Sequence, residues 1–323
     1  MKLKVIAAGL AVLSLLAGCA SSAAKRVINV VGTASYDDED SSVQKVDLKA
    51  EKLEKLSIDS GSGDFTVHIA EDGQPYVQMK TQIRGIHIGP APRLDVEEKD
   101  NATGISVSGG GWICLGSVRK AIDLYLPRDT VRELKAKIGS GTFTCGEMKL
   151  DNLEFRLSSG EAVLDSVSAE EMGLYVSSGD FTLKDAKAGR VEAKLTSGDM
   201  NLETTGEPIA LKTSVSSGHF TFAGGISQGE LECTSGKVDV ASTTLPEALS
   251  CTVSSGDICL ELPEQQEAAE GFSVACKVSS GKFYNEFPHQ DSGGKQVTGK
   301  GERDYSFKVT SGNIRLKPTN RKG

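Results

Sequence analysis

The stretch Leu174-Tyr-Val-Ser-Ser-Gly-Asp-Phe-Thr-Leu183 decides the fold, because close copies of it return at a nearly fixed spacing. The next copy is Ala193-Lys-Leu-Thr-Ser-Gly-Asp-Met-Asn-Leu202. The glycine of this unit recurs at almost even steps, at Gly141, Gly160, Gly179, Gly198, Gly218, Gly236 and Gly256. A fixed period of about 19 residues is typical of a solenoid, in which each repeat stacks on the one before it.

Each repeat contains two short strands separated by the glycine. In the first copy, Leu174 and Val176 alternate with polar residues before Gly179, and Phe181 and Leu183 alternate with polar residues after it. The apolar positions change from odd to even across the glycine, which predicts that the chain turns there. Glycine tolerates a positive φ at such a corner, and serine can bond the backbone groups that the bend leaves unpaired. The expected corner residues are Gly141, Gly160, Gly179, Gly198, Gly218, Gly236, Gly256, Gly281 and Gly312.

No segment shows a sustained helical period, so crossover helices are not expected and the strands must coil as one sheet. The sequence therefore predicts an all-β, single-stranded parallel β-solenoid with rungs of about 19 residues. The regular rungs should occupy residues 132–317, preceded by a strand-rich part over 45–131 and followed by a tail at 318–323. The last two glycine steps, from Gly256 to Gly281 and from Gly281 to Gly312, are longer than the others, so residues near 264–271 and 285–303 should protrude as loops.

The amino terminus predicts export and lipidation. Lys2 and Lys4 precede a short apolar stretch, which ends in Leu16-Ala-Gly-Cys19. Residues 1–18 have the features of a secretory signal and are too short for a membrane-spanning helix of about 20 residues. The last four residues resemble the bacterial lipobox, which implies lipid on Cys19 and a lipid-anchored, extracytoplasmic protein. An ordinary secreted protein with a chance cysteine is the alternative. Residues 19–44 are expected to form a lipidated tether, in which Val27–Val31 could form a strand and add it to a sheet.

Charge limits the partners. The chain has 36 basic and 44 acidic residues, and removal of Lys2 and Lys4 leaves 34 against 44, a formal charge of −10. Such a balance argues against nucleic acid or an anionic lipid surface as a ligand, because no basic stripe is present to neutralise phosphates. The membrane is expected as a partner only through the N-terminal lipid, and an envelope polysaccharide or protein remains open.

Catalytic and metal-binding patterns are weak. Gly225-Ile-Ser-Gln-Gly229 matches the string of a nucleophile elbow, but an elbow requires a strand that leads into a helix. The histidines lack ligand spacing. Acidic residues share one position on successive rungs and could bind calcium or a sugar, although later rungs place His219 and Lys237 there. The acidic residues are Glu161, Asp180 and Asp199, and the histidines are His68, His87, His219 and His289. No cofactor is expected.

Two further patterns have alternative interpretations. Outward threonines at Thr144, Thr182 and Thr221 suggest an ice-binding array, which Val163, Asn201 and Asp239 would interrupt. Trp112 could be a sugar platform or could close one end of the core. Four inward cysteines, Cys145, Cys233, Cys251 and Cys276, should pack as free, buried thiols. Cys251 and Cys276 are expected on successive rungs.

Three parts of the chain carry a family resemblance. They are the ending Val297-Thr-Gly-Lys-Gly-Glu-Arg-Asp-Tyr-Ser-Phe-Lys-Val-Thr-Ser-Gly-Asn-Ile-Arg-Leu316, the serial Ser-Ser-Gly-Asp-Phe units and Leu124-Tyr-Leu-Pro-Arg-Asp-Thr130. Together they resemble the bacterial putative-adhesin family of β-strand-repeat domains of unknown function. The resemblance covers roughly residues 45–317. It implies a β-helix-like solenoid at the cell envelope and carries over no catalytic residues. Cysteine-rich rungs such as Cys251–Cys259 depart from the family pattern.

The sequence thus favours a non-catalytic structural, adhesive or interaction module of the cell envelope. A polysaccharide-acting β-helix lyase or hydrolase is the alternative, and it would need converging acid, base or metal-binding residues along one groove. If the module binds through a loop, the break in the period at 285–303 is the candidate, because loops carry function more often than regular rungs do. Its contact residues would be Phe287, His289, Gln290 and Asp291.

Overall fold

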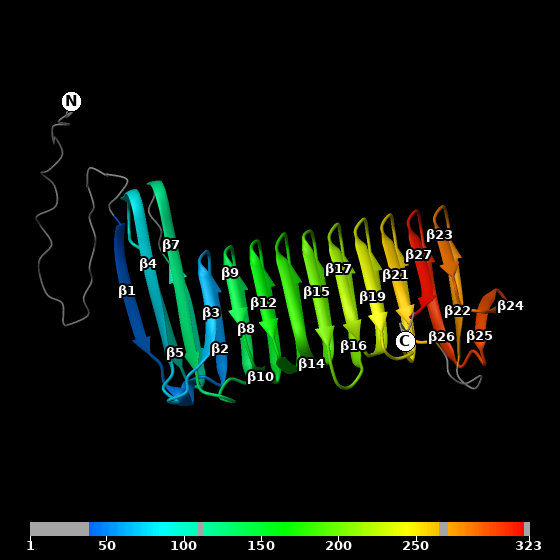
Figure 1. The fold of residues 1–323 in the computed structure, drawn as a ribbon, viewed down its shortest axis with the longest axis horizontal. Coiled ribbons are helices and arrows are strands. Elements are labelled where there is room, and N and C mark those ends of the chain that lie inside the picture. Colours follow the sequence, from blue (N-terminus) through cyan, green and yellow to red (C-terminus); the bar gives the residue numbers. More distant parts are fainter. Residues whose placement is uncertain (1–38, 109–112, 265–270, 320–323) are drawn as a thin grey trace, which may run out of the picture.

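The computed structural model describes residues 39–108, 113–264 and 271–319, which form 27 strands and one 3-10 turn. The signal peptide, Cys19 and Trp112 lie outside the described residues. The rungs stack side by side along one axis (Figure 1), as the sequence predicted. Within the described residues, no helix is long and apolar enough to span a membrane.

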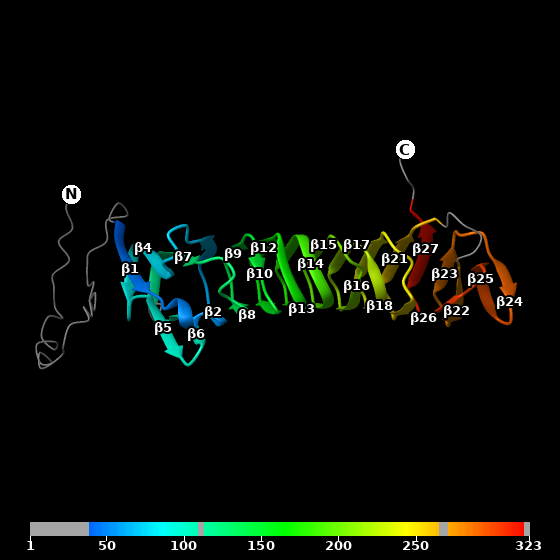
Figure 2. The same ribbon diagram turned by 90° about the horizontal axis from the view of Figure 1, so that it is seen from below.

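Each rung has two main sides, which form two rows of strands (Figure 2). Face B consists of the strands before each corner, and face A of those after it. In spatial order face B contains β5 (Arg93–Lys99), β6 (Ala102–Ser108), β2 (Lys55–Ser60), β8 (Glu133–Ile138), β11 (Asn152–Leu157), β13 (Val167–Val176), the end of β14 (Asp180–Leu195), β16 (Ile209–Val215), β18 (Ile226–Cys233), β20 (Ala248–Val253), β26 (Arg303–Val309), β22 (Gly271–Val278), β25 (Lys295–Gly299) and β24 (Gln290–Ser292).

Face A is arranged in the same way. It contains β1 (Glu39–Asp47), β4 (Tyr76–Ile88), β7 (Ile113–Leu126), β3 (Asp64–Ile69), β9 (Thr142–Cys145), β12 (Glu161–Asp165), the start of β14, β15 (Asp199–Thr204), β17 (His219–Gly224), β19 (Lys237–Ser242), β21 (Asp257–Leu262), β27 (Asn313–Pro318) and β23 (Lys282–Asn285). A short third side, with β10 (Met148–Lys149), returns the chain to face B. From β3 and β2 to β23 and β22 the neighbouring rungs pair in parallel.

The core is a set of ladders of identical positions. Alternate side chains of both faces point inward, and successive rungs place them in register. Aromatic rings also link the two faces: the ring centroids are 5.6 Å apart for Phe65 and Phe143, which share one ladder of face A, and 4.9 Å for Phe143 and Phe155 of face B. The return residues Val167 and Ala186 are also buried, so one continuous apolar core runs through the stack.

All nine expected corner glycines lie at corners, but the physical reason differs from the expected one. Only Gly141, Gly160 and Gly198 have a positive φ. What the nine share is close approach: a Cβ on each would lie 1.8–2.5 Å from the carbonyl oxygen of the neighbouring corner glycine. Glycine is therefore required because the corners stack backbone on backbone. In the first rung Gly63 occupies this place, since a Cβ on Gly141 would meet the oxygen of Gly63.

The last rungs are stacked out of sequence order, which corrects one prediction. After β21 the chain skips one position, builds β22 and β23 at the far end, and then returns to insert β26 and β27 between them and the preceding rung. Phe307 therefore pairs with both Cys251 and Cys276. The two cysteines are separated by a complete rung, and they do not lie on successive rungs as expected from their spacing in the chain.

The N-terminal part combines rungs with a cap. β4 pairs with β1 and β7 in antiparallel fashion, and β5 pairs likewise with β6. The tether expected over residues 19–44 is shorter, because β1 already begins at Glu39. The ends of β4 and β7 extend beyond the corners of the rungs (Figure 1).

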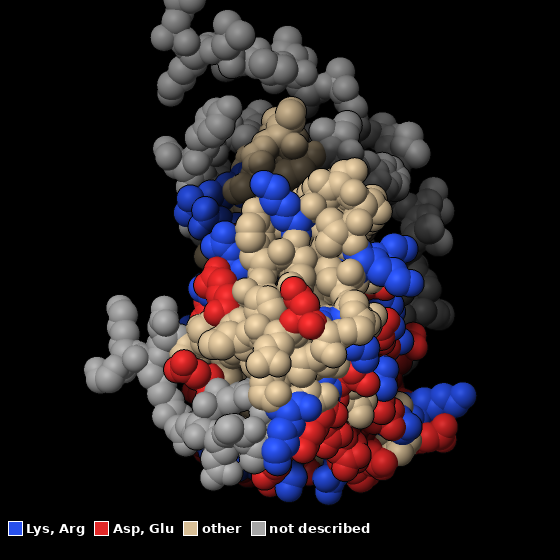
Figure 3. Space-filling model, turned by 90° about the vertical axis from the view of Figure 1, so that its right-hand side faces the viewer, with Lys and Arg blue, Asp and Glu red and all other residues tan. Residues whose placement is uncertain are grey.

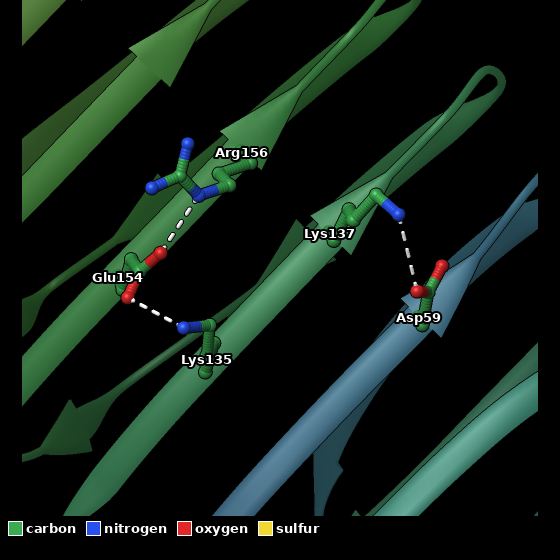
Figure 4. Close-up of polar contacts among 5 residues, drawn as sticks. All are labelled: Asp59, Lys135, Lys137, Glu154 and Arg156. Carbon is green, nitrogen blue, oxygen red and sulfur yellow. Dashed lines mark hydrogen bonds and ion pairs between the residues drawn. The ribbon is translucent and has the colours of Figure 1, made fainter.

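Pairs of opposite charges lie on the outer surface of face B from β2 to β18. Lys137 lies 3.3 Å from Asp59 of the preceding rung, and Glu154 binds both Lys135, at 2.9 Å, and Arg156, at 2.7 Å (Figure 4). Exposed pairs of this kind each contribute about 0–1 kcal/mol. Their main effect is to keep basic side chains of this face next to acidic ones, so they form no stripe that could bind a polyanion.

Candidate functional site

A groove opens where strands of unequal length end side by side. β3 continues to Ile69 and β7 to Leu126, whereas β9 stops at Cys145, whose partner in β3 is Val67. The stepped edge leaves a hollow of about 1350 Å³ near β10, at the lower edge of the rungs in Figure 1. We call it the rung-end groove. It continues past the next rungs as far as Lys187 and Thr205.

The floor of the rung-end groove is apolar and chemically inert. Val67, Ile69, Met148 and Val167 line it, together with Cys145. The thiol of Cys145 lies 3.2 Å from the sulfur of Met148, and burial raises the pKa of Cys145 to about 12. A thiol with that pKa stays protonated at neutral pH, so Cys145 is not an activated nucleophile.

The rim carries both signs of charge. Acidic residues are more numerous than basic ones, and Arg128 donates a hydrogen bond to Glu147. The rim residues are Glu71, Asp72, Asp129, Glu147 and Asp185, with Arg128, Lys149 and Lys187. Asp129, Ser166 and Asp185 have φ values of 57°, 59° and 48°, in the left-handed region that few residues other than glycine adopt. Backbone held in this region often lies at ligand-binding sites.

A stack of rings borders one end of the groove. The ring centroids of Tyr76 and Tyr125 are 4.4 Å apart, and those of Tyr125 and His68 are 4.6 Å apart. The ammonium of Lys45 lies 3.8 Å from the ring centroid of Tyr76. Nε2 of His68 lies 2.9 Å from a carboxylate oxygen of Asp123, and this contact fixes the orientation of the imidazole. The stack therefore presents nearly parallel ring planes across three strands of face A, β4, β7 and β3.

The stack ends on an open position. Because Val67 pairs with Cys145, the residue next to His68 on the following strand is Gly146, which has no side chain. A Cβ at Gly146 would meet nothing within 4 Å. No side chain at Gly146 therefore covers the face of the His68 ring that is turned away from Tyr125, and His68 borders the groove. A planar ring or the apolar face of a sugar could continue the stack there.

The positions singled out in the sequence are distributed elsewhere. Glu161, Asp180 and Asp199 are in register as expected, yet the described residues contain no group of acidic, histidine or cysteine side chains that could hold a metal ion. The threonine row is interrupted as expected. Residues 226–229 lie within strand β18, and no described helix follows them, so they form no nucleophile elbow. Of the histidines, His219 binds Asp239 at 2.7 Å, and His68 alone borders the groove.

The expected interaction loop has a different structure. Residues 285–303 fold back as the hairpin β24–β25, which pairs with β22. Phe287 is only 4% exposed and packs edge-on against Phe272, at 5.2 Å between ring centroids, so it is a core residue and is not available to a ligand. His289, Gln290 and Asp291 are exposed. The free state of the six described cysteines agrees with the prediction, although Cys276 is only half-buried.

Sequence reasoning missed Tyr76, Tyr125 and Asp123. Tyr125 was visible in the motif Leu124-Tyr-Leu-Pro, but the ladder that brings it beside His68 joins residues that are far apart in the chain. The groove itself depends on where β9 ends, which no local pattern marks.

Comparisons with known proteins give one family model and several similar solved structures. The model of the Toastrack family DUF4097 matches residues 92–317. No curated protein matches the sequence significantly. A "putative adhesin" of Bacteroides fragilis is 16% identical over 86% of this chain and 97% of its own, with a TM-score of 0.42. A "putative lipid binding protein" of Parabacteroides distasonis is 15% identical over 85% and 96%, with a TM-score of 0.49. A "putative adhesin" of Parabacteroides merdae is 10% identical over 87% and 96%, with a TM-score of 0.41.

Proposed function

This chain belongs to the Toastrack family DUF4097, and we propose that it is a lipid-anchored, non-catalytic module of the bacterial cell surface that binds an extended glycan in the rung-end groove. The observation that carries this proposal is the open face of His68 above Gly146, at the end of a fixed ring stack. The adhesin descriptions of the similar structures agree with such a role.

A binding role suits the groove better than catalysis. Its thiol is protonated, its floor is apolar, and the acidic row of Glu161, Asp180 and Asp199 lies on the outer surface of face A. An extended ligand suits it because the hollow crosses several rungs, each about 4.8 Å from the next. A neutral or basic glycan is favoured over a polyanion, since acidic residues outnumber basic ones on the rim and in the mature chain.

The lipid anchor at Cys19 would hold the N-terminal end of the solenoid near the membrane. β1 begins at Glu39, so only residues 20–38 separate the anchor from the cap. At this same end Ile86, Ile88 and Leu115 expose 36%, 47% and 66% of their surface on the extensions of β4 and β7. Apolar side chains at that position are compatible with a nearby lipid surface. Cys19→Ala should abolish extraction into detergent; an unlipidated wild type, or a variant that still partitions with membranes, would overturn the anchor.

The binding proposal is tested with a blocking substitution. Gly146→Phe should fill the stacking place beside His68 without strain, because the position is open and its φ is not positive. Gly61→Phe is the matched control, since a Cβ there also meets nothing within 4 Å. Binding to immobilised chitin, cellulose and peptidoglycan should fall at least tenfold in Gly146→Phe and in His68→Ala, and should persist in Gly61→Phe.

The same assay separates the alternatives. A Tyr175→Ala variant, which removes an aromatic side chain of face B that lies beside Arg156, should bind as well as the wild type. Equal binding by wild type and Gly146→Phe would contradict the groove as the binding site. Release of soluble sugars by the wild-type protein would favour the polysaccharide-acting enzyme instead.

A further inference from the structure

The terminal rung leaves a strand edge without a neighbour among the described residues. β23 pairs only with β27, and residues 275–278 of β22 pair only with β26. The N–H groups of Lys282 and Glu286 donate to Gly312 and Leu316. Because successive residues of a strand face opposite sides, the N–H and C=O groups of Phe283 and Asn285 point to the open side.

The same rung leaves the apolar core uncovered. Val278 is 45% exposed, whereas Val309 and Val253, at the same ladder position in the two preceding rungs, are 1% and 0% exposed. Phe283 is half-buried, although its neighbour Ile314 is fully buried. Figure 3, which looks onto this end, shows mainly residues other than Lys, Arg, Asp and Glu over its middle and upper part, with isolated acidic and basic ones among them.

The space beside this edge fits a single strand better than the end of a second solenoid. The hairpin β24–β25 continues face B for two strands beyond the first half of β22, a projection of about 10 Å. A second copy that approached end-on would meet the hairpin before it reached β23. An extended chain can lie beside the hairpin and pair with β23 along its whole length.

We propose that this edge accepts an added β-strand from another molecule of the same protein, and that the strand is the tether segment Val27-Ile-Asn-Val-Val31. The segment lies outside the described residues, carries no charge and consists mostly of β-branched residues, which favour strands. Its alternation puts Ile28 and Val30 on one face, where they would cover Phe283 and Val278. Pairing of this kind supplies backbone hydrogen bonds for affinity and apolar contacts for specificity.

The donor must be a second molecule, because the tether cannot reach its own far end. Face A has twelve strand-to-strand steps from β1 to β23, or about 58 Å. The seven residues between Val31 and Glu39 span at most about 28 Å. The tether could also pair with its own β1, but the inward residues of that edge are Ser42, Gln44 and Val46, so little apolar surface would be buried there.

The test uses the full mature chain with Cys19→Ala, so that lipid does not drive association. Sedimentation velocity over rising concentration should show head-to-tail oligomers for this protein. Val30→Lys, which leaves every described residue unchanged, should weaken association at least tenfold. Asn285→Pro, which removes an N–H on the open side, should do the same, while Asn285→Ala should not, although both substitutions lose the side-chain bonds of Asn285 to Gln296 and Phe287.

Mixing gives the decisive result. Val30→Lys retains an intact edge and Asn285→Pro an intact tether, so their equimolar mixture should form dimers and nothing larger. A wild type that remains monomeric would overturn the proposal. Oligomers that survive either substitution, or that both substitutions abolish but mixing does not restore, would also overturn it. Loss in Asn285→Pro alone would favour edge-to-edge pairing of two copies.

Discussion

The two ends of the solenoid are closed in different ways. At the N-terminal end the edge strands are charged: five of the seven residues of β5 are acidic or basic. Gln44 bridges the two faces there, since its amide donates to the carbonyl of Pro92 and accepts from the N–H of Leu94. Leu48 and Leu53, in the loop with η1 (Ala50–Lys52), are buried in the core. Charges on edge strands and a covered core are the usual protection against unwanted strand pairing.

The C-terminal end has only half of this protection. Phe287 and the hairpin β24–β25 close the core beside Phe272, but the part next to the Ser-Gly corner exposes Val278 and Tyr284. β23 has one charged residue in four. Repeat proteins require a polar cap at each end to remain soluble as single molecules. The contrast indicates that the N-terminal end is built to remain unpaired, whereas the C-terminal end is built to receive another strand.

The largest expected effect comes from the corner glycines. Gly198→Val places a side chain 2.3 Å from the oxygen of Gly179 at a positive φ, so an inner rung must separate from its neighbour. We expect a loss of about 3 kcal/mol or more in the free energy of unfolding. Gly281→Val meets Gly312 in the same way but should release only β22, β23 and the hairpin, because no described rung lies beyond it.

Thermal unfolding and amide hydrogen exchange check this pair. Gly61→Val, at a position with open space, should unfold close to the wild type. If Gly281→Val lowered the protection of the N-terminal rungs as much as Gly198→Val does, the end rung would not be a separable unit.

The residues that close the core at each end come next. Leu53→Ala at the N-terminal end and Phe287→Ala at the C-terminal end each remove a buried side chain, at a cost of about 2–5 kcal/mol. Chemical denaturation measures both. Phe287→Ala should also expose Phe272 and raise hydrogen exchange in β22 and β25, while Leu53→Ala should leave those strands unchanged. A cost below about 1 kcal/mol for Phe287→Ala would mean that the C-terminal end is not closed by this ring.

One ladder position compares the inside of the stack with its end. Val309→Ser buries a hydroxyl where the valine is 1% exposed, and should cost about 2–3 kcal/mol. Val278→Ser, one rung further out and 45% exposed, should cost less than about 1 kcal/mol in the isolated molecule. Equal costs, measured by denaturation at a concentration where the protein is monomeric, would show that Val278 is covered in solution.

The repeated Ser-Gly unit was enough to predict the rungs, their two sides and the positions of the corners from Gly141 onward. The period is a local signal, repeated often enough to exclude other folds. The order of the last rungs was not predictable, because Cys251 and Cys276 follow each other in the chain and only the later insertion of Phe307 separates them. The sequence showed the break in period at 285–303 but not that Phe287 turns back into the core.

The candidate site was less predictable than the fold. Its ring stack joins Tyr76, Tyr125 and His68 from three strands that are not consecutive in the chain. The empty place beside His68 is a glycine that lies outside the corner pattern, so nothing local distinguished Gly146 from the other glycines of the chain. Both features follow from register between distant strands, which the Ser-Gly repeat does not specify in the irregular N-terminal part.

The smallest effect concerns a carboxylate at each end. At the C-terminal end Asp304 accepts hydrogen bonds from Lys295 of the hairpin, at 2.6 Å, and from Ser273 of β22, at 2.5 Å; the bond from Lys295, followed by that from Ser273, holds the pKa of Asp304 below its usual 3.8. At the N-terminal end burial acts to raise the pKa of Glu98, but the bonds from the N–H and ammonium of Lys49 outweigh it and lower that pKa.

A carboxyl whose pKa is lower in the folded state contributes stability above its unfolded pKa, and the contribution disappears as the pH falls through the folded value. Both ends should therefore loosen at acid pH, below about pH 4, and remain unchanged from about pH 5 to 8. Hydrogen exchange at pH 7 and pH 3, corrected for intrinsic rates, should show lower protection of β24 and β25 at pH 3. In Asp304→Asn this difference should shrink while the N-terminal end still responds, and Glu98→Gln should give the converse. If Asp304→Asn retained the full change at the hairpin, another group would control that end.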